Sequence, residues 1–119
     1  MTAVTWLHSI LGPALAGALV VLALSALATL RGGLPGWLET SRRVVLALLV
    51  AEAALGLALA LRGSAPAEPI HWVYGAAAIV VLLLPGALVE RDGMPSRGAA
   101  LVVASGVAAL LAWRLWATG

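Results

Sequence analysis

Long apolar runs alternate along the chain with short polar segments. Four runs approach the roughly 20 mostly apolar residues that a membrane-spanning helix needs, and they occupy residues 5–30, 44–61, 69–89 and 98–116. Among the charged residues, only Glu52 lies well inside one of these runs. Transmembrane β-strands would instead show alternating segments of about 10 residues. The pattern predicts an all-α integral membrane protein.

The connections between the runs are short and rich in Gly and Pro, at residues 31–36, 62–66 and 90–95. Short connections force neighbouring helices to be antiparallel. We therefore expect a single domain, residues 1–119, folded as an up-down-up-down four-helix bundle. No basic residue precedes the first run, which argues against a cleaved signal peptide. We expect the first helix to belong to the mature protein.

Composition supports a membrane setting. Of the 119 residues, 63% are apolar and 10% are charged, and the mean hydropathy is +1.09. A soluble domain of this size could not bury so much apolar surface. The chain has no cysteine, which excludes disulfides and thiolate metal sites. The net charge of +2 rests on few ionisable groups and does not indicate nucleic-acid binding.

The arginines predict the orientation. Five lie in or beside the first and third connections, and only Arg62 and Arg114 lie on the opposite side. By the positive-inside rule, the first and third connections are cytoplasmic and both termini face outward. The absence of lysine and phenylalanine is typical of a GC-rich bacterial genome. We therefore expect a multi-pass protein of the bacterial inner membrane.

Two histidines are candidate ligands. His8 lies near the outer end of the first helix and His71 near the outer end of the third, so the predicted topology places both at one membrane depth. Gly12 and Gly75 each follow a histidine by four residues. Because positions i and i+4 share a helix face, each histidine has a bare patch one turn deeper.

This constellation suits bis-histidine haem b. The first and third helices of such a bundle lie on a diagonal of roughly 11–14 Å, given neighbouring axes about 8–10 Å apart. That separation accommodates two imidazoles on one metal ion. The haem edge would rest on Gly12 and Gly75, and its propionates would face Arg62 and Arg114.

Other interpretations of the histidines remain open. Two interfacial histidines can occur without any ligand, and glycines also serve close helix packing. Ala67 precedes His71 by four residues, which matches the spacing of bacteriochlorophyll-binding antenna polypeptides. The cofactor would then be bacteriochlorophyll, or there would be none.

Part of the chain resembles one four-helix half of haem A synthase. The resemblance rests on Leu48-Leu-Val-Ala-Glu-Ala-Ala-Leu-Gly56, a Pro-containing connection, and Pro69-Ile-His-Trp-Val-Tyr-Gly75. It implies a haem-binding transmembrane bundle in which His71 is one axial ligand, His8 is its partner, and Glu52 is the polar position of the preceding helix.

The synthase catalytic motif is missing. Those enzymes carry a glutamate three residues before a histidine-arginine pair, whereas Thr5 and Ser9 stand at these places around His8. Their long outer loop is also absent. We therefore expect electron transfer or haem handling, and neither synthase activity nor a stand-alone enzyme.

Glu52 lies at mid-membrane depth, where an ionised carboxylate costs about 2.5–3.5 kcal/mol on insertion scales. We expect its side chain to face the bundle interior in the neutral form. It is then either a proton-coupled group, or a structural one bonded across the bundle to Ser25 or Ser105.

A second class of function fits the small size and smooth apolar faces of the chain. It would be a non-catalytic accessory subunit, without a cofactor of its own, of a larger respiratory or photosynthetic membrane complex. A homo-oligomer would suit the same faces.

Overall fold

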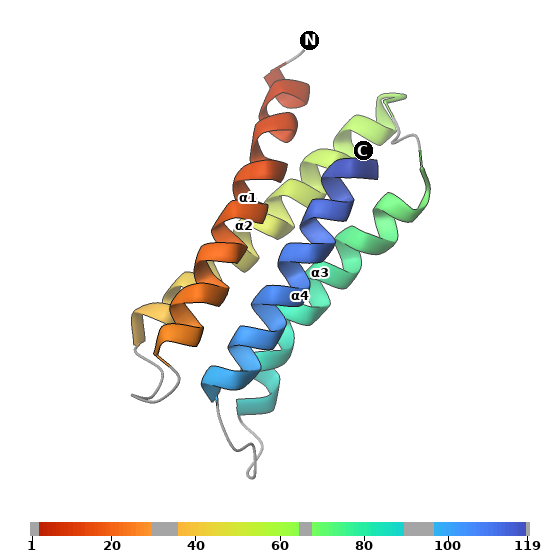
Figure 1. Cartoon of the computed structure of the whole chain (residues 1–119). Coiled ribbons are helices and arrows are strands. Elements are labelled where there is room, and N and C mark those ends of the chain that lie inside the picture. The colour runs from red at the N-terminus through yellow and green to blue at the C-terminus, as the bar shows by residue number, and fades with distance from the viewer. Residues whose placement is uncertain (1–2, 30–35, 65–67, 90–96, 119) are drawn as a thin grey trace.

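The computed structural model describes residues 3–29, 36–64, 68–89 and 97–118, with the side chains of 85–89, 97 and 98 left out of the description. These residues form four α-helices: α1 (Ala3–Ala28), α2 (Gly36–Leu61), α3 (Ile70–Val89) and α4 (Arg97–Thr118). Successive helices run in opposite directions, as the colour gradient in Figure 1 shows. The all-α four-helix bundle is confirmed.

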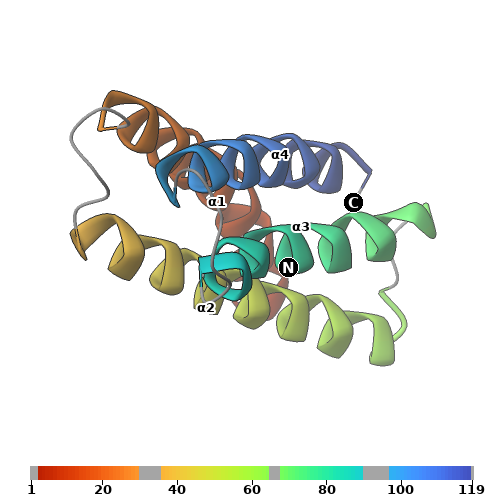
Figure 2. The ribbon, with the colours of Figure 1, turned by 90° about the horizontal axis from the view of Figure 1, so that it is seen from below.

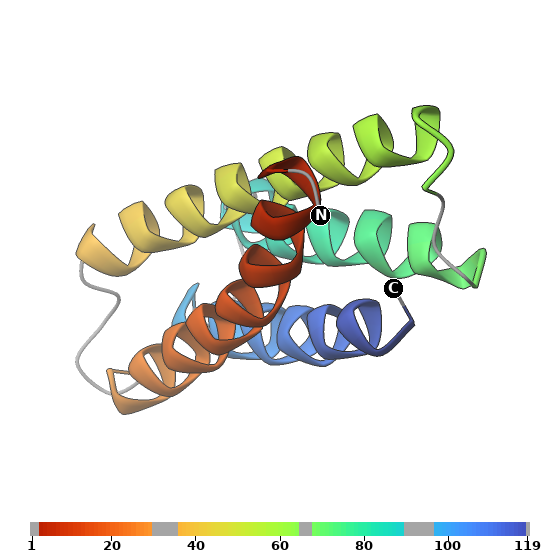
Figure 3. The same cartoon turned by 90° about the horizontal axis from the view of Figure 1, so that it is seen from above.

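The helices close into a bundle in which each contacts two neighbours. α1 packs on α2 and α4, and α3 packs on the same two helices, so α1 and α3 lie on a diagonal. The contacts of α4 with α1 and α3 are the closest, whereas α2 and α3 pack most loosely. The views from below and above show α1 lying obliquely, with its red N-terminal end turned towards α2 (Figures 2 and 3).

The core follows the helical period. Leu15, Leu19, Leu22 and Ala26 on α1 recur every three or four residues and are buried. The facing positions of α4 are mostly small, since Ala104, Ala108 and Ala112 are buried there. Small residues let helix backbones approach closely, which accounts for the tight packing of α4.

The outer surface is apolar, as lipid contact requires. Large exposed side chains include Val21, Leu24, Val103 and Leu110, each more than 60% exposed. Three helical stretches are long and apolar enough to cross a membrane: Ala3–Ala28, Gly36–Leu61 and Ala99–Thr118. In α3, the part with described side chains is apolar over Ile70–Leu84 but shorter than these. The chain thus has the helices of a multi-pass membrane protein.

One predicted boundary is wrong: α2 begins at Gly36, well before residue 44. The first two turns contain Glu39, Arg42 and Arg43, which interrupt the apolar run. They continue the helix because Glu39 pairs with Arg42 and Arg43 at i+3 and i+4. The length of an apolar run does not predict where a helix begins when its first turns consist of paired charged residues.

Arg42 also ties α2 to α3. Its side chain is buried, and its Nη1 donates a hydrogen bond of 2.8 Å to the backbone carbonyl of Leu82. Its Nε donates to Glu39 Oε2 at 3.0 Å, and Nη2 donates to Oε1 of the same carboxylate. Arg43 pairs with Glu39 as well, but its side chain is 74% exposed. The two arginines share a partner and differ in burial.

We predict that Arg42→Leu destabilises the bundle by about 1.5–3 kcal/mol, because hydrogen bonds to a charged donor are lost and Glu39 loses its buried partner. Arg43→Leu is the matched control and should cost less than about 1 kcal/mol, as exposed pairs do. Denaturation in detergent micelles, followed by circular dichroism, measures both changes. Equal losses for the two variants would contradict a structural role for the buried contact.

Candidate functional site

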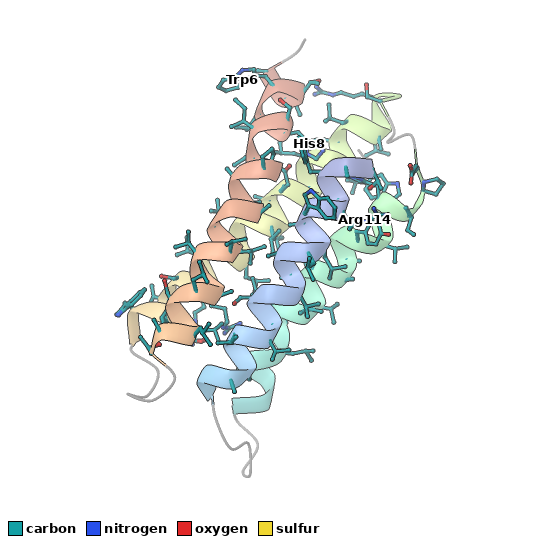
Figure 4. All side chains as sticks on the ribbon, in the orientation of Figure 1. Trp6, His8 and Arg114 are labelled. Carbon is teal, nitrogen blue, oxygen red and sulfur yellow. The ribbon has the colours of Figure 1, made fainter. Side chains whose placement is uncertain are left out.

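The two histidines meet inside the bundle. The ring centroids of His8 on α1 and His71 on α3 lie 6.4 Å apart, with an angle of 61° between the ring planes. The side chains reach across the diagonal between two helices that do not pack on each other. Figure 4 shows His8 directed from α1 into the bundle and Trp6, two residues earlier, directed away from it. The structure thus brings together the two candidate ligands that the sequence singled out.

Glu52 on α2 joins this pair. Its side chain is buried, as predicted, but its neighbour is His8 and not a serine. His8 Nδ1 and Glu52 Oε1 are 2.9 Å apart, within ion-pair distance, although the ring N–H is not aligned for a hydrogen bond. The expected bond to Ser105 is absent, because the buried Ser105 Oγ has no partner among the described residues. Ser25 lies towards the other end of α1, where its carbonyl accepts the Thr29 hydroxyl.

His71 has a different environment. Its side chain is buried, and its ring lies within reach of the backbone carbonyl of Leu115 on α4. Its Nδ1 nevertheless makes no aligned hydrogen bond. Among the described residues, three buried polar atoms without an aligned partner therefore lie at this site: His8 Nδ1, Glu52 Oε2 and His71 Nδ1. Each such atom costs about 1–3 kcal/mol when left unsatisfied, so this grouping is characteristic of a functional site.

Two cavities meet at the histidine pair. They have volumes of about 330 and 350 Å³. The residues that line both are His8, Glu52, Gly56, His71, Trp72 and Leu115. The two histidines and Glu52 therefore belong to the wall of both cavities.

The cavities differ in chemistry. The first, here called the hydroxyl-lined cavity, is also bordered by Thr5, Ser9 and Ser64, close to the ends of α1, α2 and α3. The second, here called the apolar cavity, lies between α2 and α3 and is also lined by Leu49, Ala53, Leu57, Gly75, Ala76 and Ile79. Both cavities share the two histidines and Glu52, but only the hydroxyl-lined cavity also has Thr and Ser side chains in its wall.

Glycines shape this space. Gly12 borders the hydroxyl-lined cavity and Gly75 the apolar one, in line with the predicted bare patches. A Cβ added at Gly12 would lie 3.8 Å from Glu52 Oε1, and one at Gly75 would lie 3.6 Å from a Leu115 methyl group.

Gly56 belongs to the site and was missed as a site residue. A Cβ there would lie 3.4 Å from His8 Cε1 and 3.9 Å from His8 Nε2. The signal was available, because Gly56 follows Glu52 by four residues and so shares its helix face. The same i+4 spacing that identified Gly12 and Gly75 after the histidines also identifies Gly56 after Glu52.

The two candidate propionate partners lie outside the cavities. Arg62 and Arg114 are exposed, and neither is among the residues described as lining either cavity. The Arg114 guanidinium lies 5.7 Å from the centroid of the Tyr74 ring. Figure 4 places Arg114 at the same end of the bundle as His8. An interaction of these arginines with a bound anion stays a prediction.

Comparison with known proteins gives no match: no family model, curated protein or solved structure is similar to this chain. The site is therefore interpreted from its own residues. Within the described part of the chain, no three His, Cys, Asp or Glu side chains are placed to hold a metal ion together.

We predict that Gly56→Leu destabilises the protein by about 1–3 kcal/mol, the usual cost of overpacking, because the new side chain must displace the His8 ring. Gly17→Leu is the matched control. It is also a helix glycine, but a Cβ there meets nothing within 4 Å, so its effect should stay within about 0.5 kcal/mol. Thermal unfolding in detergent compares the two. A Gly56→Leu protein as stable as wild type would show that the His8 ring is not held against α2.

Proposed function

We propose that this chain is a multi-pass membrane protein that binds one haem b between His8 and His71, and that it serves electron transfer or haem handling. The observation that carries the proposal is the facing pair of histidine rings at the junction of two cavities.

The spacing of the rings supports two-sided ligation. Two imidazoles that bind one metal ion from opposite sides, at about 2 Å per metal–nitrogen bond, have ring centroids roughly 6 Å apart. The observed separation is 6.4 Å. Because the ring of each axial ligand can rotate about its bond to the metal, the angle of 61° between the ring planes is compatible with this arrangement.

The polarity of the cavities also fits haem. Haem carries two propionates on one edge and apolar substituents on the opposite edge. The hydroxyl-lined cavity, with Thr5, Ser9 and Ser64, suits the charged edge. The apolar cavity, with Leu49, Leu57 and Ile79, suits the other edge. Gly12, Gly56 and Gly75 lie in the walls of these cavities, where the absence of a side chain lets other groups lie close to the helix backbones.

A haem held by His8 and His71 would supply one-electron transfer, since both of its axial iron-binding nitrogens would come from the protein. The protein's own contribution is to supply the two nitrogens and to exclude water from the ring. His71 is buried and His8 is partly buried, and both lie among apolar helices.

We predict a sharp α-band in the reduced-minus-oxidised visible spectrum of protein purified after haem-replete expression. His8→Ala and His71→Ala should each abolish the band, because each removes one axial ligand. Thr40→Ala, an exposed change near the start of α2, is the control and should retain it. Circular dichroism shows that the variants keep their helices.

A featureless spectrum of the wild-type protein would contradict haem binding. It would favour the cofactor-free accessory subunit, while chlorophyll-type absorption would favour bacteriochlorophyll.

We further propose that all four helices cross the bacterial inner membrane, with both termini outside. Three long apolar helical stretches support a bilayer setting, and α3 has 20 residues in all. The five-to-two division of the arginines supports the orientation. The apolar surface fits lipid, and also a larger membrane complex or a second copy of the chain.

Cysteine labelling of intact cells tests this topology, because the chain has no cysteine of its own. Thr40→Cys, beside the first connection, should resist a membrane-impermeant maleimide. Glu68→Cys, exposed in the second connection, should react. The reverse pattern would invert the orientation, and reaction at both sites would contradict the four-span topology.

A further inference from the structure

Among the described residues, the Glu52 carboxylate has a short polar contact with His8, one of the two candidate haem-binding histidines. The Glu52 side chain is 5% exposed, and its Oε1 lies 2.9 Å from His8 Nδ1. We propose that Glu52 is a positioning residue for His8. Its carboxylate would accept a hydrogen bond from Nδ1–H, which would leave the lone pair of Nε2 for the haem iron. This inference rests on the proposed function.

The chemistry of imidazole makes the contact consequential. A neutral imidazole carries one proton, so one ring nitrogen donates and the other has the lone pair that binds a metal. An acceptor beside Nδ1 fixes the proton there and orients the ring, as carboxylates do for many metal-bound histidines. The present geometry meets the distance requirement of a hydrogen bond but not the angle. A rotation of the ring or of the carboxyl group therefore suffices to align it.

Helix α2 holds the ring at two points. Glu52 contacts Nδ1, while Gly56, one turn later on the same face, lies beneath Cε1 and Nε2. Because Gly56 has no side chain, the His8 ring lies directly against the backbone of α2, and both residues line the two cavities. The same stretch of helix thus supplies an acceptor beside Nδ1 and a surface against which the rest of the ring packs.

The two candidate ligands differ in this respect. The His71 ring has the backbone carbonyl of Leu115 near it and no carboxylate among the described side chains. A change at Glu52 therefore acts on one axial ligand only. A carboxylate at this depth is expensive in a membrane, and a merely structural polar contact would not need a charged or acidic group here.

The experiment compares Glu52→Gln and Glu52→Leu in the full-length, haem-loaded protein. The amide oxygen of Gln can still accept a hydrogen bond from Nδ1–H, whereas Leu offers no acceptor. Loss of the hydrogen-bond acceptor behind a metal-bound histidine typically weakens metal binding about 10- to 100-fold. We expect that loss in haem affinity for Glu52→Leu, measured by titrating the apoprotein with haem, and less than a tenfold loss for Glu52→Gln.

The midpoint potential of the haem gives a second, non-structural readout. A weaker acceptor makes His8 a poorer electron donor and so destabilises the ferric state. The potential should therefore rise from wild type to Glu52→Gln to Glu52→Leu. The control is Glu68→Gln, which changes an exposed carboxylate at the same end of the bundle that borders neither cavity. It should alter neither quantity.

The possible outcomes distinguish failure of haem binding from failure of the positioning role of Glu52. If the wild-type protein binds no haem, or binds it without His8, the proposed function fails. If haem binding requires both histidines but Glu52→Leu matches wild type in affinity and in midpoint potential, haem binding stands and the positioning role of Glu52 is wrong. If Glu52→Gln is as impaired as Glu52→Leu, the acceptor role is also wrong, because Gln retains an acceptor.

Discussion

A carboxylate and two imidazoles buried among apolar helices must find their partners inside the protein, because lipid offers none. His8, Glu52 and His71 come from three different helices and meet in one place. In the bundle, α1 and α3 lie on a diagonal with α2 beside both, so that the three side chains can point towards a common centre. The need to pair these polar groups therefore constrains how the helices are arranged.

The two ends of the bundle satisfy their polar groups differently. Near the start of α2, Arg42 is fully engaged by the Glu39 carboxylate and the Leu82 carbonyl. At the other end, the polar atoms of the histidine site are buried without aligned partners and border two cavities. The polar groups at the Arg42 end are thus paired, whereas those at the histidine end lack aligned partners among the described residues. Such incomplete pairing is costly in stability, and the proposed haem site offers an explanation for it.

The helices also pack more tightly on one side of the bundle than on the other. Alanines on α4 let α1 and α3 each approach α4 closely and form the tightly packed side of the bundle. Helix α2 packs loosely on α3, and the apolar cavity lies between these two helices. The cavity thus lies on the side of the bundle where the helices pack loosely, and the tightly packed side fixes the positions of α1 and α3 relative to α4.

The amino-acid sequence by itself determined the number of helices, their alternating direction and the common depth of His8 and His71. Apolar run length sets what can span a bilayer, and short connections set the direction of each helix. It also indicated that Glu52 faces inward, because a carboxylate facing lipid is too costly. It did not show that α2 begins at Gly36, since charge pairs extend that helix beyond its apolar run.

Only the tertiary structure decided that Glu52 contacts His8 rather than a serine, that Gly56 lies under the His8 ring, and that Arg62 and Arg114 lie outside the cavities. These facts depend on the rotation of each helix about its own axis. An amphipathic helix reveals that rotation through its apolar stripe, but helices that are apolar on every side do not. The rotation is then set by how the small and large side chains of neighbouring helices fit together, which is a property of the assembled bundle.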